Sequence, residues 1–217
     1  MTAPHAPRTA GLQHEHALVA AGYRVIVGID EAGRGAWAGP VAAGAVCLPL
    51  DRDDVAQLLA GVYDSKQVSA RARGNLVERI QTTARAWGVG RAEAHEIDAL
   101  GIVPATCLAM ERALALVQAQ VTPDYLLIDS IRWTNRQLPH TALIKGDSLS
   151  LSIAAASILA KVARDGWMVE YDAQYPGYGF AGHKGYGVAT HHTALREHGP
   201  TPLHRMTFAP LRQFRLF

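Results

Sequence analysis

The sequence predicts one α/β domain, with a central mixed β-sheet flanked by helices and a helical C-terminal region. Three observations favour this class. Short, continuously apolar runs indicate strands that are buried on both faces. From about residue 69 onward these runs alternate with helical patterns, and no repeat or linker divides the chain. We therefore expect a flexible lead over residues 1–22, a single domain over residues 23–208 and a tail over residues 209–217.

The first half of the domain should contain three strands and one helix. Residues 25–29 and 41–48 are expected to be strands on either side of a glycine-rich loop. Ser69 can cap a helix that runs to about residue 86, because serine oxygens accept hydrogen bonds from helix N-terminal amides. A strand over residues 89–94 should follow.

The second half should alternate helices with short strands. A helix is expected to begin with Pro104 at its first position, followed by apolar residues at offsets of three and four. These are Cys107, Met110, Leu114, Val117 and Val121. Residues 125–128 and 142–144 are expected to be strands, and residues 150–171 a long alanine-rich helix. Its residues Ala154 to Ala156 should let that helix approach the sheet closely.

The composition excludes several classes of protein. With 49% hydrophobic and 18% charged residues the chain is that of a globular protein. No stretch reaches the roughly 18 apolar residues of a membrane span, and the N-terminus lacks the apolar core of a secretory signal. Cys47 and Cys107 lie in apolar runs, as buried thiols do in a reducing compartment. We expect a cytoplasmic protein, and its net charge of +2 permits a polyanionic partner without demonstrating one.

Carboxylates follow several of the predicted strands. Asp30 and Glu31 end the first strand, Asp129 ends another, and Asp147 follows a third. Acids at strand ends are most often solvated turn residues, but the carboxyl ends of strands are also where α/β sheets bind ligands. Four carboxylates at one edge repel one another unless divalent cations share them. Oxygen ligands without clustered Cys or His favour Mg²⁺ or Mn²⁺.

Such an arrangement indicates hydrolysis of a phosphodiester. Two ions about 4 Å apart can activate a water and stabilise the leaving oxygen. The sequence contains neither a Gly-x-Ser-x-Gly elbow nor a phosphate-binding P-loop. The alternatives at this point are another acidic two-metal nuclease and a nucleic-acid-binding protein without catalysis.

Several separated motifs resemble those of the ribonuclease HII family, in the family's order. They are GIDEAGRGAWAGPV at 28–41, DSK at 64–66, EID at 96–98, ATCLAMERA at 105–113, KGD at 145–147, IAAASILAKVARD at 153–165, and YPGYGFAGHKGYG at 175–187 with His204, Arg205 and Phe208. The similarity covers about residues 24–211. Several motifs in order are far more specific than one.

The resemblance implies a ribonuclease H-like fold and an endoribonuclease. Such an enzyme cuts on the 5′ side of ribonucleotides in RNA/DNA hybrids or embedded in duplex DNA, leaving 5′-phosphate and 3′-hydroxyl ends. Its role is ribonucleotide excision and RNA primer removal. The resemblance implies that two Mn²⁺ or Mg²⁺ ions are bound by Asp30, Glu31, Asp129 and Asp147.

The resemblance also implies a set of nucleic-acid contacts. Gly33, Arg34 and Gly35 would read a ribose 2′-hydroxyl through the backbone, and Tyr186 would stack beside the sugar. The residues expected near the phosphate backbone are Ser65, Lys66 and Lys184. The chain departs from the family's usual residues at Ala36, Trp37, Gly101, Ser130 and Val188, of which Ser130 replaces a Gly after the third acid.

Other polar residues have simpler interpretations. Asp165 competes with Asp147 as the fourth acid, but four residues after Lys161 it can form an ordinary helical ion pair. Surface or capping roles are expected for His191, His192 and His198. A mainly solvated helix face is expected for Arg71, Arg73, Arg79 and Arg85.

The C-terminal pentapeptide is unusually apolar for a chain end. It resembles the short peptides by which bacterial replication and repair proteins bind the sliding clamp, with Gln213, Leu216 and Phe217 as contacts. The alternative is that Phe214 and Leu216 pack back onto the domain. We expect a monomer.

Overall fold

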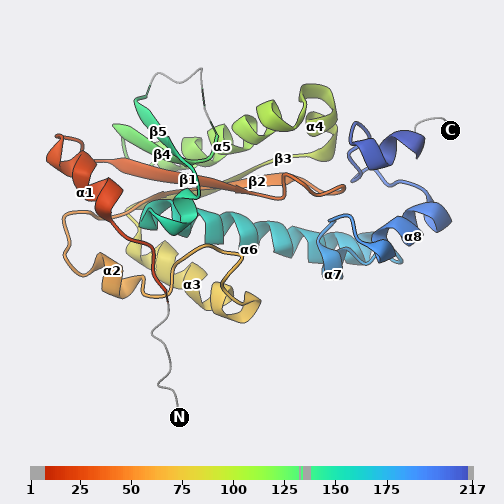
Figure 1. Ribbon diagram of the computed structural model, residues 1–217, viewed down its shortest axis with the longest axis horizontal. Coiled ribbons are helices and arrows are strands. Elements are labelled where there is room, and N and C mark those ends of the chain that lie inside the picture. The colour runs from red at the N-terminus through yellow and green to blue at the C-terminus, as the bar shows by residue number, and fades with distance from the viewer. Residues whose placement is uncertain (1–7, 132, 134–137, 215–217) are drawn as a thin grey trace, which may run out of the picture.

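The computed structural model describes residues 8–131, 133 and 138–214. Figure 1 labels their helices and strands. In chain order these are α1 (Gln13–Ala20), β1 (Ile26–Ala32), β2 (Val41–Cys47), α2 (Val55–Leu58), α3 (Ala70–Thr83), β3 (Ala86–Ala92), α4 (Ala94–Leu100), α5 (Ile102–Gln118), β4 (Tyr125–Asp129), β5 (His140–Leu143), η1 (Gly146–Ser148), α6 (Leu151–Gln174), α7 (Phe180–His183), α8 (Ala189–His198) and η2 (Ala209–Phe214). No helix within these ranges is long and apolar enough to cross a membrane.

The sheet is mixed, as the sequence predicts. Its strand order is β3-β2-β1-β4-β5. β2 is antiparallel to β1 and to β3, whereas β1, β4 and β5 are parallel. Ile29 of β1 pairs with Ile128 of β4, so Asp30 and Asp129 follow neighbouring positions at the same edge. The register therefore brings the acids of two strands together.

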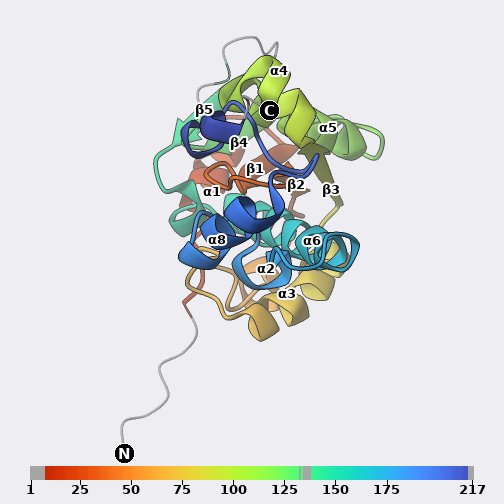
Figure 2. The same ribbon diagram turned by 90° about the vertical axis from the view of Figure 1, so that its right-hand side faces the viewer.

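Helices cover both faces of the sheet (Figures 1 and 2). An apolar core lies between the sheet and α5 on one face, and a second core joins the sheet to α6 and α3 on the other. α6 approaches the sheet so closely that a Cβ on Gly44 would lie 2.2 Å from the Ala156 carbonyl oxygen. Ala154 to Ala156 are fully buried, which confirms that small residues permit this approach.

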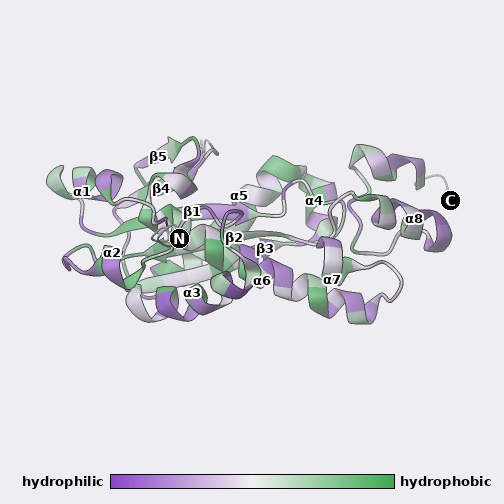
Figure 3. Cartoon of the chain, turned by 60° about the horizontal axis from the view of Figure 1, so that its bottom comes forward, coloured by the Kyte–Doolittle hydropathy of each residue, from purple (hydrophilic) through white to green (hydrophobic). Residues whose placement is uncertain are grey.

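Helix α3 is amphipathic. Along α3, hydrophilic and hydrophobic residues alternate in Figure 3, and its buried residues are Leu76 and Ile80. The Ser69 hydroxyl accepts a hydrogen bond from the Ala72 amide at 3.3 Å, so the predicted N-cap is confirmed. Farther along the chain, α7, α8 and η2 gather at one end of the sheet and form the expected helical C-terminal region (Figure 1).

Several predicted boundaries were wrong. α3 ends at Thr83 rather than near residue 86, and β3 occupies 86–92 rather than 89–94, because these residues pair with β2. α5 begins at Ile102, after Gly101 with φ +84°, so Pro104 is not its first residue. Helix α4 was not predicted as a separate element. β5 ends at Leu143, which leaves Ile144 81% exposed.

The N-terminal segment differs from the flexible lead that the sequence suggests. The Ala10 amide donates to the Val62 carbonyl oxygen at 2.9 Å, and Glu15 of α1 is completely buried. The Glu15 carboxylate accepts hydrogen bonds from Ser150 and Ser152 at the start of α6. Residues 9–20 therefore pack against the domain.

Candidate active site

Three carboxylates meet at the carboxyl ends of β1 and β4. Asp30 is the last buried residue of β1, Glu31 follows it in the same strand, and Asp129 ends β4. One oxygen from each of these three residues lies within 4.8 Å of the others. The parallel pairing of β1 with β4 accounts for this proximity, because neighbouring residues of parallel strands reach the same edge.

The electrostatics of this group favour a bound cation. Burial raises the pKa of Asp30 well above its usual range, the Glu31 and Asp129 charges raise it further, and the neighbouring Ser157 hydroxyl opposes the shift. Burial also raises the pKa of Glu31, against a hydrogen bond from Arg34, whose Nη1 lies 3.0 Å from Glu31 Oε1. The other oxygen, Glu31 Oε2, is buried without a hydrogen-bond partner among the described residues. The hydrogen bonds from neighbouring residues therefore do not offset the negative charge of these three carboxylates.

Asp147 lies outside that group of three. It is part of η1, is 7% exposed, and is linked to the group through Gly146, whose amide donates to Asp129 Oδ1 at 2.6 Å. Burial, then the Asp64 and Asp129 carboxylates, raise the pKa of Asp147, and Lys66 opposes them. Asp64 was missed by the sequence interpretation, although it begins the DSK element.

A cleft of about 530 Å³ is lined by Asp30 and Glu31 together with most of the predicted nucleic-acid contacts. Its lining residues are Asp30, Glu31, Ala32, Gly33, Arg34, Gly35, Ser65, Lys66, Ser157, Lys161 and Tyr186. A second hollow, of about 500 Å³, shares Lys66 with the cleft and is lined by Asp129, Asp147, Asp64, Ser130 and Lys145 among others. Asp30 and Glu31 therefore line the cleft, and Asp129 and Asp147 line the hollow beside it.

The turn after β1 exposes its backbone to the cleft. Gly33 has φ +91°, and a Cβ there would lie 1.9 Å from Arg164 Nε, so only glycine fits. A Cβ on Gly35 would meet nothing within 4 Å. In the described part of the chain, the amide N–H groups of Arg34 and Gly35 have no hydrogen-bond acceptor. They are free to bind a ligand in the cleft.

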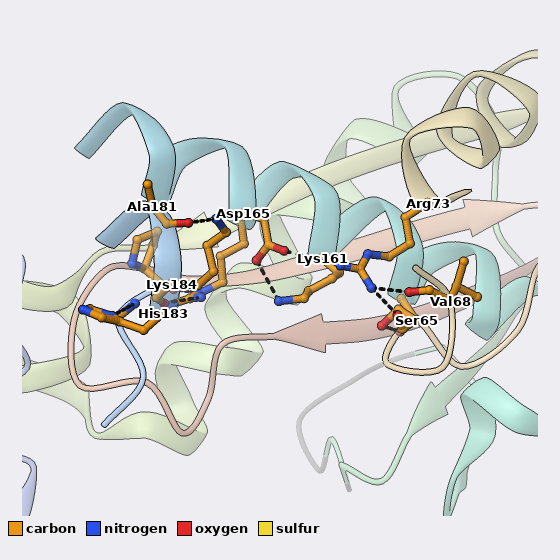
Figure 4. Close-up of polar contacts among 12 residues, drawn as sticks. Ser65, Val68, Arg73, Lys161, Asp165, Ala181, His183 and Lys184 are labelled. Atoms are coloured by element: carbon orange, nitrogen blue, oxygen red, sulfur yellow. Dashed lines mark hydrogen bonds and ion pairs between the residues drawn. The ribbon is translucent and has the colours of Figure 1, made fainter. Parts of the chain in front are cut away.

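The DSK loop is held from the side of α3 and α6. Ser65 is 4% exposed and its Oγ lies 2.9 Å from Ser157 Oγ. Arg73 donates to the carbonyl oxygens of Ser65 and Val68 at 2.7 and 2.6 Å (Figure 4). Arg73 is therefore a structural residue of this loop rather than a member of a solvated face.

Asp165 forms the helical ion pair that the sequence predicts. Lys161 Nζ lies 2.7 Å from Asp165 Oδ1, and Arg73 Nη2 lies 3.7 Å from Asp165 Oδ2 (Figure 4). Asp165 is not in the group of three acids. Lys184 is also outside the cleft lining, and its amine donates to the Ala181 carbonyl oxygen (Figure 4).

Tyr186 lies over two basic residues of α6. Its side chain is 37% exposed, with the Lys161 amine 6.0 Å and the Arg164 guanidinium carbon 5.5 Å from the ring centroid. Among the cleft residues, Ser157 and Lys161 were missed by the sequence interpretation. Their spacing of one helical turn, which continues to Arg164, was the available indication.

The surface role predicted for His191 was wrong. His191 is completely buried, and its Nε2 lies 3.0 Å from His204 Nε2. Burial lowers the pKa of each ring to about 4. His198 is exposed, as predicted, and His192 is half-buried.

Other departures from expectation have local causes. Arg85 lies beyond the end of α3 and pairs with Asp51, so it is not on that helix face. Trp37 packs against the C-terminal region, since a Cβ on Gly187 would lie 2.1 Å from its ring. Ser130 adopts a left-handed conformation with φ 50°, which glycine tolerates better.

Comparison with known proteins identifies the family. The model of the ribonuclease HII family matches residues 27–211. The chain is 54% identical to a ribonuclease HII of Roseiflexus castenholzii, over 92% of this chain and 88% of that protein. It is 49% identical to a ribonuclease HII of Geobacter sulfurreducens, over 96% and 93% of the two chains. The chain belongs to the ribonuclease HII family.

Solved structures of ribonucleases H share its fold. The crystal structure of ribonuclease H2 from Pyrococcus horikoshii has a TM-score of 0.71 at 23% identity, covering 87% of this chain and 96% of that one. A PCNA:RNase HII complex from Archaeoglobus fulgidus has a TM-score of 0.68 at 26% identity, covering 85% and 95%. The predicted family and ribonuclease H-like fold are confirmed. As a ribonuclease HII the protein is a metal-dependent endoribonuclease, of a family that acts on RNA/DNA hybrids.

Proposed function

We propose that this ribonuclease HII cuts on the 5′ side of a ribonucleotide in RNA/DNA hybrids and in duplex DNA, leaving 5′-phosphate and 3′-hydroxyl ends. Its role would be ribonucleotide excision and RNA primer removal. The observation that carries this proposal is the cleft itself. Asp30 and Glu31 line it together with Gly33, Gly35 and Tyr186, so hydrolysis and recognition of the sugar share one surface.

The acids fit two divalent cations, Mg²⁺ or Mn²⁺. The donor set is entirely oxygen, which these hard cations prefer. The unpartnered oxygen of Glu31 and the raised pKa of Asp30 both indicate negative charge that lacks a counterion. We assign Asp30, Glu31, Asp129 and Asp147 as the ligands. When bound, the cations supply an activated water and stabilisation of the leaving oxygen.

The remaining cleft residues recognise the nucleic acid. The free amides of Arg34 and Gly35 are suited to bind a ribose 2′-hydroxyl, the group that distinguishes RNA from DNA. Gly33 places the turn against α6, and Tyr186 offers a half-exposed ring for stacking beside the sugar. Ser65, Lys66 and Lys184 are assigned to the phosphate backbone; of these, Ser65 and Lys66 line the cleft.

One assay tests the reaction and its specificity. Three duplexes are compared in Mn²⁺ or Mg²⁺: DNA with one ribonucleotide, an RNA/DNA hybrid, and DNA alone. We expect cleavage of the first two, none of the third, and complete loss in excess EDTA. Cleavage of all-DNA duplex at the same rate, or products with 2′,3′-cyclic phosphate, would contradict the proposal.

The ligand assignment is tested by charge-neutral variants. Asp30→Asn, Glu31→Gln and Asp129→Asn should each lower kcat by orders of magnitude while the protein remains folded. Asp54→Asn is the matched control, because the Asp54 carboxylate is exposed, pairs with Arg52 and lines neither the cleft nor the adjoining hollow. If Asp147→Asn keeps wild-type activity while Asp165→Asn is inactive, Asp165 rather than Asp147 is the fourth acid.

We also propose that the C-terminal peptide binds a sliding clamp. Gln213 is exposed in η2, where its Nε2 donates to the Pro210 carbonyl oxygen at 3.1 Å, whereas Leu216 and Phe217 lie outside the described residues. The Archaeoglobus fulgidus ribonuclease HII, a protein of the same family, was solved in complex with PCNA. Deleting residues 213–217 should abolish clamp binding and leave cleavage of short duplexes unchanged. A truncated protein that melts much earlier would instead indicate that the peptide packs on the domain. We further propose that the protein acts as a monomer in the cytoplasm.

A further inference from the structure

Two buried arginines lie beneath the residues that read the sugar. Arg164 of α6 and Arg205, between α8 and η2, are both 0% exposed. In the described part of the chain, neither guanidinium forms an ion pair with a carboxylate. Burying a charged side chain without an opposite charge costs several kcal/mol of folding free energy. We therefore expect a buried, unpaired guanidinium to have a structural role, which its hydrogen bonds should identify.

Both guanidiniums donate to backbone carbonyl oxygens of one loop. We define the glycine loop as residues 33–40 and the tyrosine segment as residues 184–187. Arg164 donates to the carbonyl oxygens of Pro40 and Ala38 at 2.9 and 3.1 Å. Arg205 donates to those of Gly39 and Arg34 at 3.0 and 2.8 Å. Four carbonyl groups of the glycine loop are therefore fixed from the interior.

Arg164 also holds the tyrosine segment. Its Nη1 donates to the Lys184 carbonyl oxygen at 2.9 Å, and its guanidinium carbon lies 5.5 Å from the Tyr186 ring centroid. The amides of Trp37 and Ala38 donate to the Gly185 carbonyl oxygen at 2.8 and 3.2 Å. A single guanidinium thus contacts both segments, which are also hydrogen-bonded to each other.

This anchoring determines which way the loop presents its amides. In a trans peptide the C=O and the following N–H point in opposite directions. The Arg34 carbonyl oxygen is bound by Arg205 in the interior, so the Gly35 N–H of the same peptide points away from Arg205. Gly35 lines the cleft and has open space beside it. The buried arginine therefore orients the amide that faces the substrate.

We propose that Arg164 and Arg205 are positioning residues, which hold the glycine loop and the tyrosine segment together as one preformed surface for reading the ribose. This inference rests on the proposed function, in which that surface binds the 2′-hydroxyl and its sugar. It assigns the two arginines no contact with the substrate. Lysine cannot replace them, because an ammonium lacks the planar fork that reaches several carbonyl groups at once.

The test is a double-mutant cycle on duplex DNA with one ribonucleotide. Arg164→Lys and Tyr186→Ala should each lower kcat/KM, by about 10- to 100-fold for a surface displaced by an ångström or less. If Arg164 acts through the tyrosine segment, adding Tyr186→Ala to the Arg164→Lys protein should cause little further loss. A merely structural role for Arg164 would instead give effects that multiply, and this result would overturn the inference.

The controls separate positioning from folding and from the proposed function. Arg196→Lys, at an exposed position of α8, should leave kcat/KM unchanged. All variants are assayed well below their melting temperatures. Should Arg164→Lys not fold, Arg205→Lys replaces it in the cycle, because the glycine loop that Arg205 holds is itself hydrogen-bonded to the tyrosine segment through the Gly185 carbonyl oxygen. If Tyr186→Ala itself has wild-type kcat/KM, the proposed role of the tyrosine fails. If Tyr186→Ala is impaired and Arg164→Lys is not, only the positioning inference fails.

Discussion

Glu15 should contribute a large share of the stability of the domain, although it lies in a segment with no sequence pattern of its own. Its Oε1 accepts hydrogen bonds from Ser150 Oγ at 2.6 Å, Ser152 N at 3.0 Å and Ser152 Oγ at 2.7 Å. The Ser152 amide belongs to the first turn of α6, so the carboxylate also satisfies a helix N-terminus and interacts favourably with its dipole.

The cost of removing this carboxylate follows from its three donors. The Ser150 and Ser152 hydroxyls lie 3.1 Å apart, so in Glu15→Ala one of them can donate to the other. The Ser152 amide and the second hydroxyl are left buried without an acceptor, at about 1 to 2 kcal/mol each, which amounts to about 2 to 4 kcal/mol of unfolding free energy. For a domain of this size we expect the melting temperature to fall by about 5 to 15 °C. Glu15→Gln keeps one acceptor oxygen and should cost about 1 to 2 kcal/mol.

Thermal and urea unfolding of the three proteins measure these effects. Glu197→Gln, at an exposed position of α8, is the matched control and should change stability by less than about 0.5 kcal/mol. A Glu15→Ala protein that melts within about 2 °C of the wild type would refute the reasoning. It would mean that α1 is not part of the cooperative unit.

Three further predictions concern pH and backbone strain. Burial lowers the pKa of His191 and His204 to about 4, so the folded protein favours the neutral form of both rings. The stability that this neutral pair contributes is fully present above about pH 6.5 and decreases as the pH falls toward 4. The amount by which His204→Asn lowers the Tm should therefore be largest at pH 7.5 and smaller at pH 5. The pKa of Asp30 is raised, so the ionised carboxylate destabilises the folded protein at neutral pH. In EDTA, the Tm of Asp30→Asn should therefore equal or exceed that of the wild type at pH 7.5, and the difference in Tm should shrink toward pH 5. A difference that is independent of pH would contradict either assignment. At Ser130, whose φ is 50°, Ser130→Gly should melt at or above the wild type and Ser130→Val several degrees below it; equal melting of all three would argue against left-handed strain.

The acids could be predicted from the sequence because their signal is local. Asp30 and Glu31 directly follow a buried strand, and Asp129 directly follows another, so strand ends alone indicated a common edge. Pairing of Ile29 with Ile128 then brings these acids together. The same local reasoning identified the Ser69 cap and the closely packed alanines of α6, both of which the structure confirms.

The buried polar residues could not be predicted, because their partners are distant in sequence. Glu15 binds residues 135 and 137 positions away, and Arg164 donates to Pro40 and Ala38, 124 and 126 positions away. A charged residue within a helix has the same sequence pattern whether it faces water or a buried loop. His191 illustrates the same limit, since only the fold brings His204 against it.

Helix α6 fixes the distance between the acids and the surface that we propose reads the sugar. Ser157 lies beside Asp30, and Arg164 binds the glycine loop and the tyrosine segment. These two residues are seven positions apart on one helix, which corresponds to a rise of about 10 Å. Gly44 and Ala156 lock the helix against the sheet, so neither end can slide relative to the acids. A ribose bound by the loop would therefore hold the neighbouring phosphate at a constant place relative to Asp30. This constant distance would account physically for the proposed cleavage at one side of a ribonucleotide rather than at variable positions along the strand.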